Sequence, residues 1–139
     1  MQRFIDAQRL MYDQALDEIK AGKKYDHWIW FIFPQIKGLG KSPNARYFGI
    51  NGLEEAGEYY AHPVLGARLK EVTQELLKHD ISAEEIFGRL DAMKVRSCMT
   101  LFYKATGDVV FKDVIDKFYG GKWDRMTFRL LETYEAAGM

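Results

Sequence analysis

The sequence predicts an all-α protein: a single compact domain of seven to nine helices over residues 1–139. Apolar residues recur at steps of three or four along most of the chain, and residues typical of helix starts and helix ends bracket these stretches. No stretch shows the sustained alternation of apolar and polar residues that marks a half-buried strand. One domain is expected because a chain of this length buries roughly two thirds of the surface that it exposes when unfolded.

The first helix is predicted over residues 3–20, where one face carries an apolar stripe formed by Phe4, Ala7, Met11, Ala15 and Ile19. Gly22 follows at the position of a C-terminal cap. The apolar run from Trp28 to Pro34 predicts a short helix, which the proline ends.

The middle of the chain carries signals for three further helix starts. Pro43 and Pro63 are expected at first helical positions, where the missing N–H group of proline costs nothing. Ser82 and Glu85 have the spacing of a capping box, which predicts a short helix through Phe87.

The last third of the chain contains three aspartates that each precede an apolar-periodic run. Asp91, Asp108 and Asp124 are therefore expected as N-caps of three helices. The glycine pair Gly120–Gly121 predicts the turn between the last two of them.

The overall composition excludes several classes of partner. Lysine plus arginine equals aspartate plus glutamate at 20 each, so no global field favours nucleic acid or an acidic membrane surface. The longest apolar run, Trp28 to Pro34, is far shorter than the roughly 20 residues that cross a bilayer. No signal peptide is evident and the single cysteine, Cys98, forms no internal disulfide, so a cytoplasmic protein is expected.

The sequence also lacks the residues that several kinds of catalytic site require. The three histidines are widely separated and Cys98 has no partner cysteine, so neither a metal site nor a cofactor is predicted. The Gly38–Ser42 stretch ends like a phosphate-binding loop, but its first glycine comes too late and no strand precedes it. Cys98 lies within a helix beside Met99 and is expected in the core rather than as a nucleophile.

Three clusters combine polar and aromatic residues. In the first, Trp28 and Trp30 are two positions apart, so on a helix with about 100° per residue they face different directions. The whole run can be core, or one indole can stack on a planar ligand while Gln35 bonds its edge.

In the second cluster, Lys94, Ser97 and Thr100 lie close together on one helix after Asp91. This polar face can hold a phosphate or carboxylate group, or it can be solvated with the hydroxyls bonded back to the helix. In the third cluster, Asp124 and Thr127 either only cap a helix or place a carboxylate in a pocket, where it can stabilise positive charge or activate water.

The strings that carry these clusters resemble a bacterial family, the domain of unknown function family numbered 1810. The most specific string is His27-Trp-Ile-Trp-Phe-Ile-Phe-Pro-Gln35, and the similarity continues through Gly38–Ser42, His62–Leu69, Lys94–Phe102 and Asp124–Thr127. This resemblance covers essentially the whole chain and implies a helical fold without an agreed activity. Asp26 and Cys98 stand where serines are expected.

A more distant similarity links the chain to small helical proteins that cleave N-glycosidic bonds in ADP-ribose and riboflavin-pathway intermediates. It is carried by Phe4–Gln8, Leu65–Gly66 and the late Trp123–Asp124 pair. The glutamate that this family places before its first run is absent here, so the resemblance implies Asp124 or Asp91 as the catalytic carboxylate.

The sequence thus predicts a pocket for a nucleotide-like or ADP-ribosyl ligand, with N-glycosidic hydrolysis as its activity. Two alternatives stay open: a non-catalytic small-molecule sensor that uses the same pocket, and a protein-interaction module. The residues predicted for catalysis are Asp124 and Asp91. The residues predicted for ligand binding are Trp28, Trp30, Gln35, Lys94, Ser97, Thr100 and Thr127. The sequence does not indicate an oligomeric state.

Overall fold

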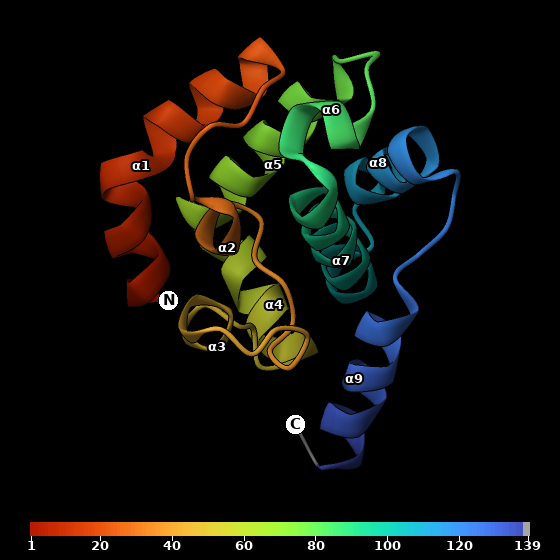
Figure 1. Ribbon diagram of the computed structural model, residues 1–139. Coiled ribbons are helices and arrows are strands. Elements are labelled where there is room, and N and C mark those ends of the chain that lie inside the picture. Colours follow the sequence, from red (N-terminus) through yellow and green to blue (C-terminus); the bar gives the residue numbers. More distant parts are fainter. Residues whose placement is uncertain (138–139) are drawn as a thin grey trace.

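Nine α-helices and no strand make up the part of the chain that the computed structural model describes, residues 1–137 (Figure 1). The predicted all-α class and the predicted range of seven to nine helices are confirmed. The helices are α1 Gln2–Ala21, α2 Ile29–Ile32, α3 Pro43–Tyr47, α4 Leu53–Ala61, α5 Leu65–Leu77, α6 Ala83–Phe87, α7 Arg89–Thr106, α8 Val109–Tyr119 and α9 Arg125–Ala136.

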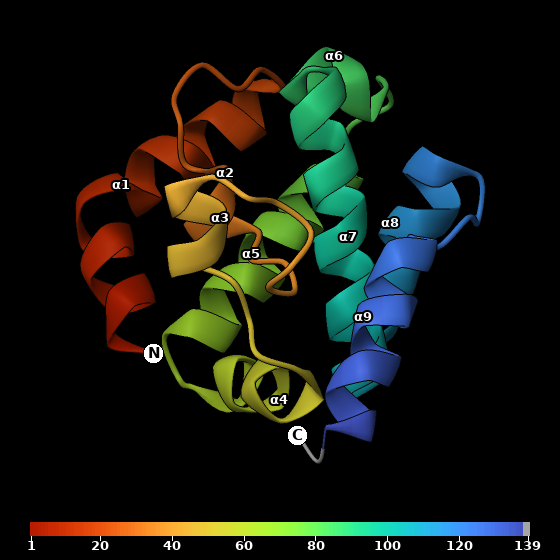
Figure 2. The same cartoon turned by 60° about the horizontal axis from the view of Figure 1, so that its bottom comes forward.

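Helix α7 lies in the middle of the molecule and packs against α2, α4, α6, α8 and α9. Helix α5 packs against α1, α4 and α8, while α1 and α9 lie at opposite edges in Figure 1. Turning the molecule shows α9 alongside α7, so the C-terminal helix covers one side of the central helix (Figure 2).

The aromatic run around α2 lies in the hydrophobic core. Trp28 and Phe33 are both 0% exposed, and the rings of both pack edge-on against Phe87 from α6. Burial of large aromatic side chains contributes most of the apolar area in a core of this kind. Cys98 is also fully buried, as predicted, and this burial raises the pKa of its thiol well above the usual value.

Most of the predicted helix ends are confirmed. Gly22 ends α1 with a left-handed φ of 78°, and Ser82 and Glu85 form both bonds of the capping box before α6. Asp108 and Asp124 cap α8 and α9, since their side chains accept backbone N–H groups of the first turn. Pro43 is the first residue of α3.

Two predicted helix starts are wrong. Helix α7 begins at Arg89 after Gly88, so Asp91 lies inside the first turn and does not cap it. Helix α5 begins at Leu65, two residues after Pro63. The chain first forms a turn over Pro63 and Val64, in which Nδ1 of His62 accepts the N–H groups of Val64 at 3.1 Å and Leu65 at 3.2 Å, so the helix begins only after this turn.

Glu18 is a buried carboxylate that joins α1 to the chain before α2. One of its oxygens, Oε1, accepts the backbone N–H groups of Tyr25 at 2.6 Å and Asp26 at 3.0 Å, and the indole N–H group of Trp28 at 3.0 Å. Burial by itself raises the pKa of Glu18, but these three hydrogen bonds outweigh it, so the pKa is lowered.

The extended segment after α2 is held in place by a short parallel bridge. Lys37 donates its N–H group to the carbonyl of Ile50 at 2.9 Å, and Ile50 donates to the carbonyl of Gln35 at 2.9 Å. Gly49 makes this approach possible, because a Cβ atom there would lie 2.7 Å from Lys37 Cα.

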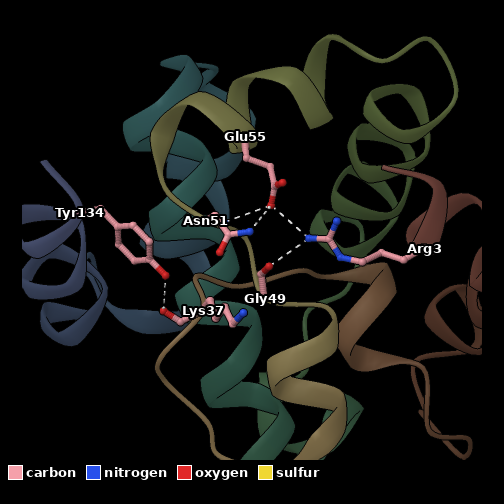
Figure 3. Close-up of polar contacts among 6 residues, drawn as sticks. All are labelled: Arg3, Lys37, Gly49, Asn51, Glu55 and Tyr134. Carbon is pink, nitrogen blue, oxygen red and sulfur yellow. Dashed lines mark hydrogen bonds and ion pairs between the residues drawn. The ribbon is translucent and has the colours of Figure 1, made fainter. Parts of the chain in front are cut away.

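Residues from both ends of the chain support this bridge (Figure 3). Arg3 of α1 donates to the carbonyl of Gly49 at 3.0 Å and to Glu55 at 3.1 Å, and Glu55 also accepts the N–H group of Asn51. Tyr134 of α9 donates its hydroxyl to the carbonyl of Lys37 at 3.1 Å. The segment that carries Gln35 is therefore tied to α1, α4 and α9.

Candidate functional site

A cavity of about 320 Å³ lies between the segment after α2, the first half of α7 and the start of α9. We call it the Gln35–Asp124 cavity. Its polar lining residues are Gln35, Lys94, Arg96, Ser97 and Asp124. Four of the predicted site residues thus line one space, although they come from three separate parts of the chain.

Asp124 combines a capping role with exposure to the cavity. Its Oδ2 atom accepts the N–H group of Thr127 at 3.1 Å and the hydroxyl of Thr127, and the Ser97 hydroxyl lies 3.1 Å away. All the hydrogen bonds that residues 1–137 make to this carboxylate end on Oδ2, which leaves Oδ1 free for a ligand or water. The carboxylate is therefore held rigidly by one oxygen and presents the other.

Thr100 and Thr127 do not line the cavity, and both are 0% exposed. The hydroxyl of Thr100 accepts the backbone N–H group of Asp124 at 3.1 Å and donates to the carbonyl of Arg96 at 2.8 Å. Both threonines thus lie buried behind Asp124, where their bonds to this residue hold it in position.

Arg96 fixes the loop before α9, a role that the sequence did not reveal. Its Nε atom donates to the carbonyl of Lys122 at 2.8 Å, and its Nη2 atom donates to the carbonyl of Trp123 at 2.7 Å. The two carbonyl groups lie 26 and 27 positions further along the chain than Arg96. No local sequence pattern could therefore have indicated these contacts. The planar guanidinium suits two neighbouring carbonyl groups because its donors form a fixed fork.

Replacing Arg96 with lysine is expected to lower the free energy of unfolding by about 1–2 kcal/mol, because one ammonium group cannot replace two directed hydrogen bonds. Urea unfolding followed by circular dichroism measures the change. Arg89→Lys, an exposed change on the same helix, is the control and should leave the stability unaltered. Equal stability of the two variants would show that the loop does not depend on the Arg96 fork.

Gln35 is nearly buried, with 8% of its surface exposed, and it faces the Gln35–Asp124 cavity. Its backbone carbonyl is bonded to Ile50, whereas no hydrogen bond within residues 1–137 involves its side-chain amide. Neither polar atom of this amide is sealed inside the protein, so both are accessible from the cavity. The Gln35 amide therefore offers its donors and its acceptor to whatever occupies the cavity.

Lys94 and Asp91 belong to a chain of charges at the edge of the cavity. Asp91 pairs with Lys24 at 2.7 Å and with Lys94 at 3.0 Å, and Lys94 Nζ lies 5.2 Å from the ring centre of Trp30. Burial raises the pKa of Asp91, but the hydrogen bonds and charges of both lysines outweigh it and lower the pKa. The three charged groups together leave one positive charge beside the cavity.

Asp91 and the two tryptophans lie outside the cavity lining. Both carboxylate oxygens of Asp91 are engaged by lysines, so its geometry is that of a group that positions Lys94. Trp28 is fully buried with its indole N–H group bonded to Glu18, so neither face of its ring is open to a ligand. Trp30 reaches the cavity only through its contact with Lys94.

The rim of the cavity is apolar and open to solvent. Leu90, Met93 and Met126 line it, and they are 72%, 59% and 49% exposed. Leu39 adds a further apolar wall. Large apolar side chains gathered around a concave surface are typical of binding sites. The cavity thus joins an apolar rim to a small set of polar groups deeper inside.

Two structural features are absent from residues 1–137. Between residues 1 and 137, no three His, Cys, Asp or Glu side chains come together in a way that could hold a metal ion. Over the same range, no helix has both the length and the apolar character that crossing a bilayer requires.

Comparison with known proteins identifies a family and a solved structure to which the chain is similar. The family model described as Protein of unknown function (DUF1810) matches residues 1–131. The crystal structure of the conserved hypothetical protein Rv1873 from Mycobacterium tuberculosis is 46% identical in sequence and has a TM-score of 0.92. The match covers 94% of this chain and 95% of that one. No curated protein matches the chain.

Proposed function

We propose, from the premise that this chain belongs to the DUF1810 family, that its Gln35–Asp124 cavity binds a nucleotide-like ligand and hydrolyses an N-glycosidic bond in it. The observation that carries the proposal is the Asp124 carboxylate, which is held through Oδ2 and free at Oδ1 in the same cavity as the unpaired amide of Gln35. A fixed carboxylate is the group that stabilises a developing oxocarbenium ion.

Each group of the cavity contacts a different part of the ligand. The Gln35 amide bonds the edge of the base, and the apolar rim of Leu90, Met93 and Met126 covers its faces. The net positive charge of the Lys24–Asp91–Lys94 group attracts a phosphate of the ligand. The ribose is then left beside Asp124.

In the proposed reaction, the bond between the ribose C1′ and the base nitrogen breaks, and the base keeps the electron pair. Asp124 Oδ1 stabilises the positive charge that develops on the ribose ring and accepts a proton from the attacking water. The water oxygen bonds to C1′, and Asp124 then returns the proton to solvent. A purine or pyrimidine base takes up a proton from solvent as it leaves, whereas nicotinamide leaves as a neutral molecule, so the products are the free base and the ribosyl alcohol. Ser97 and Thr127 hold the carboxylate in place throughout.

Replacing Asp124 with asparagine is expected to reduce turnover about a hundredfold, because the amide carries no negative charge to stabilise the transition state. Asparagine is as good an N-cap as aspartate, so α9 should remain folded. Base release from NAD, nicotinamide mononucleotide, ADP-ribose and the common nucleosides, followed by chromatography, measures the effect.

Asp108→Asn is the matched control, since Asp108 caps α8 and does not line the cavity. It should retain full turnover. Base release that survives unchanged in Asp124→Asn contradicts the role of the carboxylate. Failure of all these compounds to bind at millimolar concentration contradicts the proposed ligand class.

Ligand binding without turnover is the second candidate function. One observation favours it: the N-cap of α9 by itself accounts for an aspartate at position 124. In that case a thermal shift on ligand addition occurs without any released base.

A further inference from the structure

We infer that the Gln35–Asp124 cavity selects ligands whose ring carries a hydrogen-bond donor beside an acceptor, as a carboxamide or a lactam does, and that Gln35 determines this selectivity. The inference deepens the proposed function and rests on it, because it names the class of base that the cavity accepts. It is carried by the placement and the unpaired state of one side chain.

The first step concerns the free hydrogen-bonding capacity of Gln35. A glutamine amide has one acceptor oxygen and two donor N–H groups in one plane. The residue as a whole is 8% exposed, its amide makes no hydrogen bond within residues 1–137, and neither polar atom of the amide is sealed inside the protein. In the free protein the amide is therefore hydrated. A ligand that pairs both sides of the amide replaces this water, whereas one that displaces the water without pairing the amide leaves a buried polar group unsatisfied at a cost of about 1–3 kcal/mol.

The second step concerns rigidity. The residue before Gln35 is a proline, and the backbone carbonyl of Gln35 is bonded to Ile50 across the short bridge. The bridge is itself tied to Arg3 and Tyr134 (Figure 3). The backbone of Gln35 is therefore fixed beside the cavity, so its amide reaches the ligand from one defined side, and a recognition group with a fixed origin discriminates better than one on a mobile loop.

The third step concerns the shape and charge around the amide. Met93 and Met126 lie at the rim, and their thioethers make favourable contacts with aromatic rings. A flat ring between them presents its edge to Gln35. A carboxylate on that edge offers acceptors only, so it leaves the amide oxygen of Gln35 unpaired.

The test compares two pairs of mononucleotides by isothermal titration calorimetry. Nicotinamide mononucleotide and nicotinic acid mononucleotide differ only by a carboxamide against a carboxylate. Uridine 5′-phosphate and its N3-methyl derivative differ only by the lactam donor. We expect the protein to bind the first member of at least one pair about tenfold more tightly than the second, which corresponds to about 1.4 kcal/mol.

Gln35→Met is the decisive variant, because methionine has nearly the same volume and no hydrogen-bonding amide. It should bind both members of that pair equally, while its thermal unfolding stays close to that of the wild type. Gln14→Met, an exposed change on α1, is the control and should keep the tenfold preference.

The possible outcomes separate the two proposals. Nucleotides that bind without preference within either pair, or a preference that survives Gln35→Met, overturn the selectivity and leave the proposed pocket standing. If none of the four nucleotides binds at millimolar concentration, both the selectivity of Gln35 and the proposed function are overturned. Ribose 5-phosphate, which has no base, tests the phosphate and ribose contacts alone and should bind the wild type and Gln35→Met equally.

Discussion

Replacing Gly66 with alanine is expected to lower the free energy of unfolding by about 3–5 kcal/mol. Gly66 lies in the first turn of α5, where this helix passes close to the end of α4. A Cβ atom at this position would lie 1.9 Å from the carbonyl oxygen of Tyr60 and 2.7 Å from its carbonyl carbon. Backbone atoms cannot swing aside as a side chain does, so the two helices must separate.

The neighbourhood of Gly66 leaves little room for such a movement. Tyr60 is bonded through its hydroxyl to Asp108 at 2.6 Å, and the N–H group of Gly66 is bonded to the carbonyl of His62 at 2.9 Å. Moving α4 away from α5 therefore strains contacts to α8 as well. Urea unfolding followed by circular dichroism measures the loss.

Gly57 in α4 is the matched control for this experiment. No heavy atom lies within 4 Å of a Cβ atom built there, so Gly57→Ala introduces no clash. Alanine is the better residue inside a helix, and the variant should be more stable by about 0.5–1 kcal/mol. Gly66→Ala with a loss below about 1 kcal/mol would mean that α4 and α5 are less tightly held than their contact indicates.

Replacing Glu18 with alanine is expected to cost about 3–4 kcal/mol at neutral pH, since three hydrogen-bond donors lose one charged acceptor. The indole N–H group of Trp28 is then left in the core without a partner. The backbone N–H groups of Tyr25 and Asp26 lose theirs too, which loosens the chain before α2. Asp17→Ala, one position away and exposed, is the control and should change stability little.

The effect of Glu18 should also depend on pH. Because the pKa of Glu18 is lower in the folded protein than in the unfolded chain, its charged form stabilises the fold at any pH above the unfolded value of 4.5. This contribution is lost as the pH falls through the folded pKa. The difference in unfolding free energy between wild type and Glu18→Ala should thus be constant near neutral pH and shrink in acid. A difference that stays the same down to acid pH would show that packing, not the carboxylate charge, accounts for the loss.

Local patterns allowed most of the fold to be predicted. Helix ends such as Gly22, Asp108 and the Ser82–Glu85 box depend on residues only a few positions apart, and so they can be recognised in the sequence. The start of α5 could not be predicted in this way, because the imidazole of His62 accepts backbone N–H groups in a turn that delays the helix to Leu65.

The candidate site was harder to predict, because it depends on contacts between distant parts of the chain. Ser97 and Thr100 read alike in the sequence, yet one lines the cavity and the other is sealed beneath Asp124. Trp28 and Trp30 were equal candidates for a ligand wall, and only the buried carboxylate of Glu18 distinguishes them, by holding the first indole in the core. No sequence pattern indicated the role of Arg96, since its partners are carbonyl groups of a loop in the last fifth of the chain.

The ties at Arg3 and Tyr134 make the two ends of the chain part of the support of the Gln35–Asp124 cavity (Figure 3). A fragment that begins after Arg3, or one that stops before Tyr134, retains every residue that lines the cavity. It nevertheless lacks a brace on the wall that carries Gln35. Trimming the chain from either side therefore loosens one wall of the cavity before it removes any residue that lines the cavity.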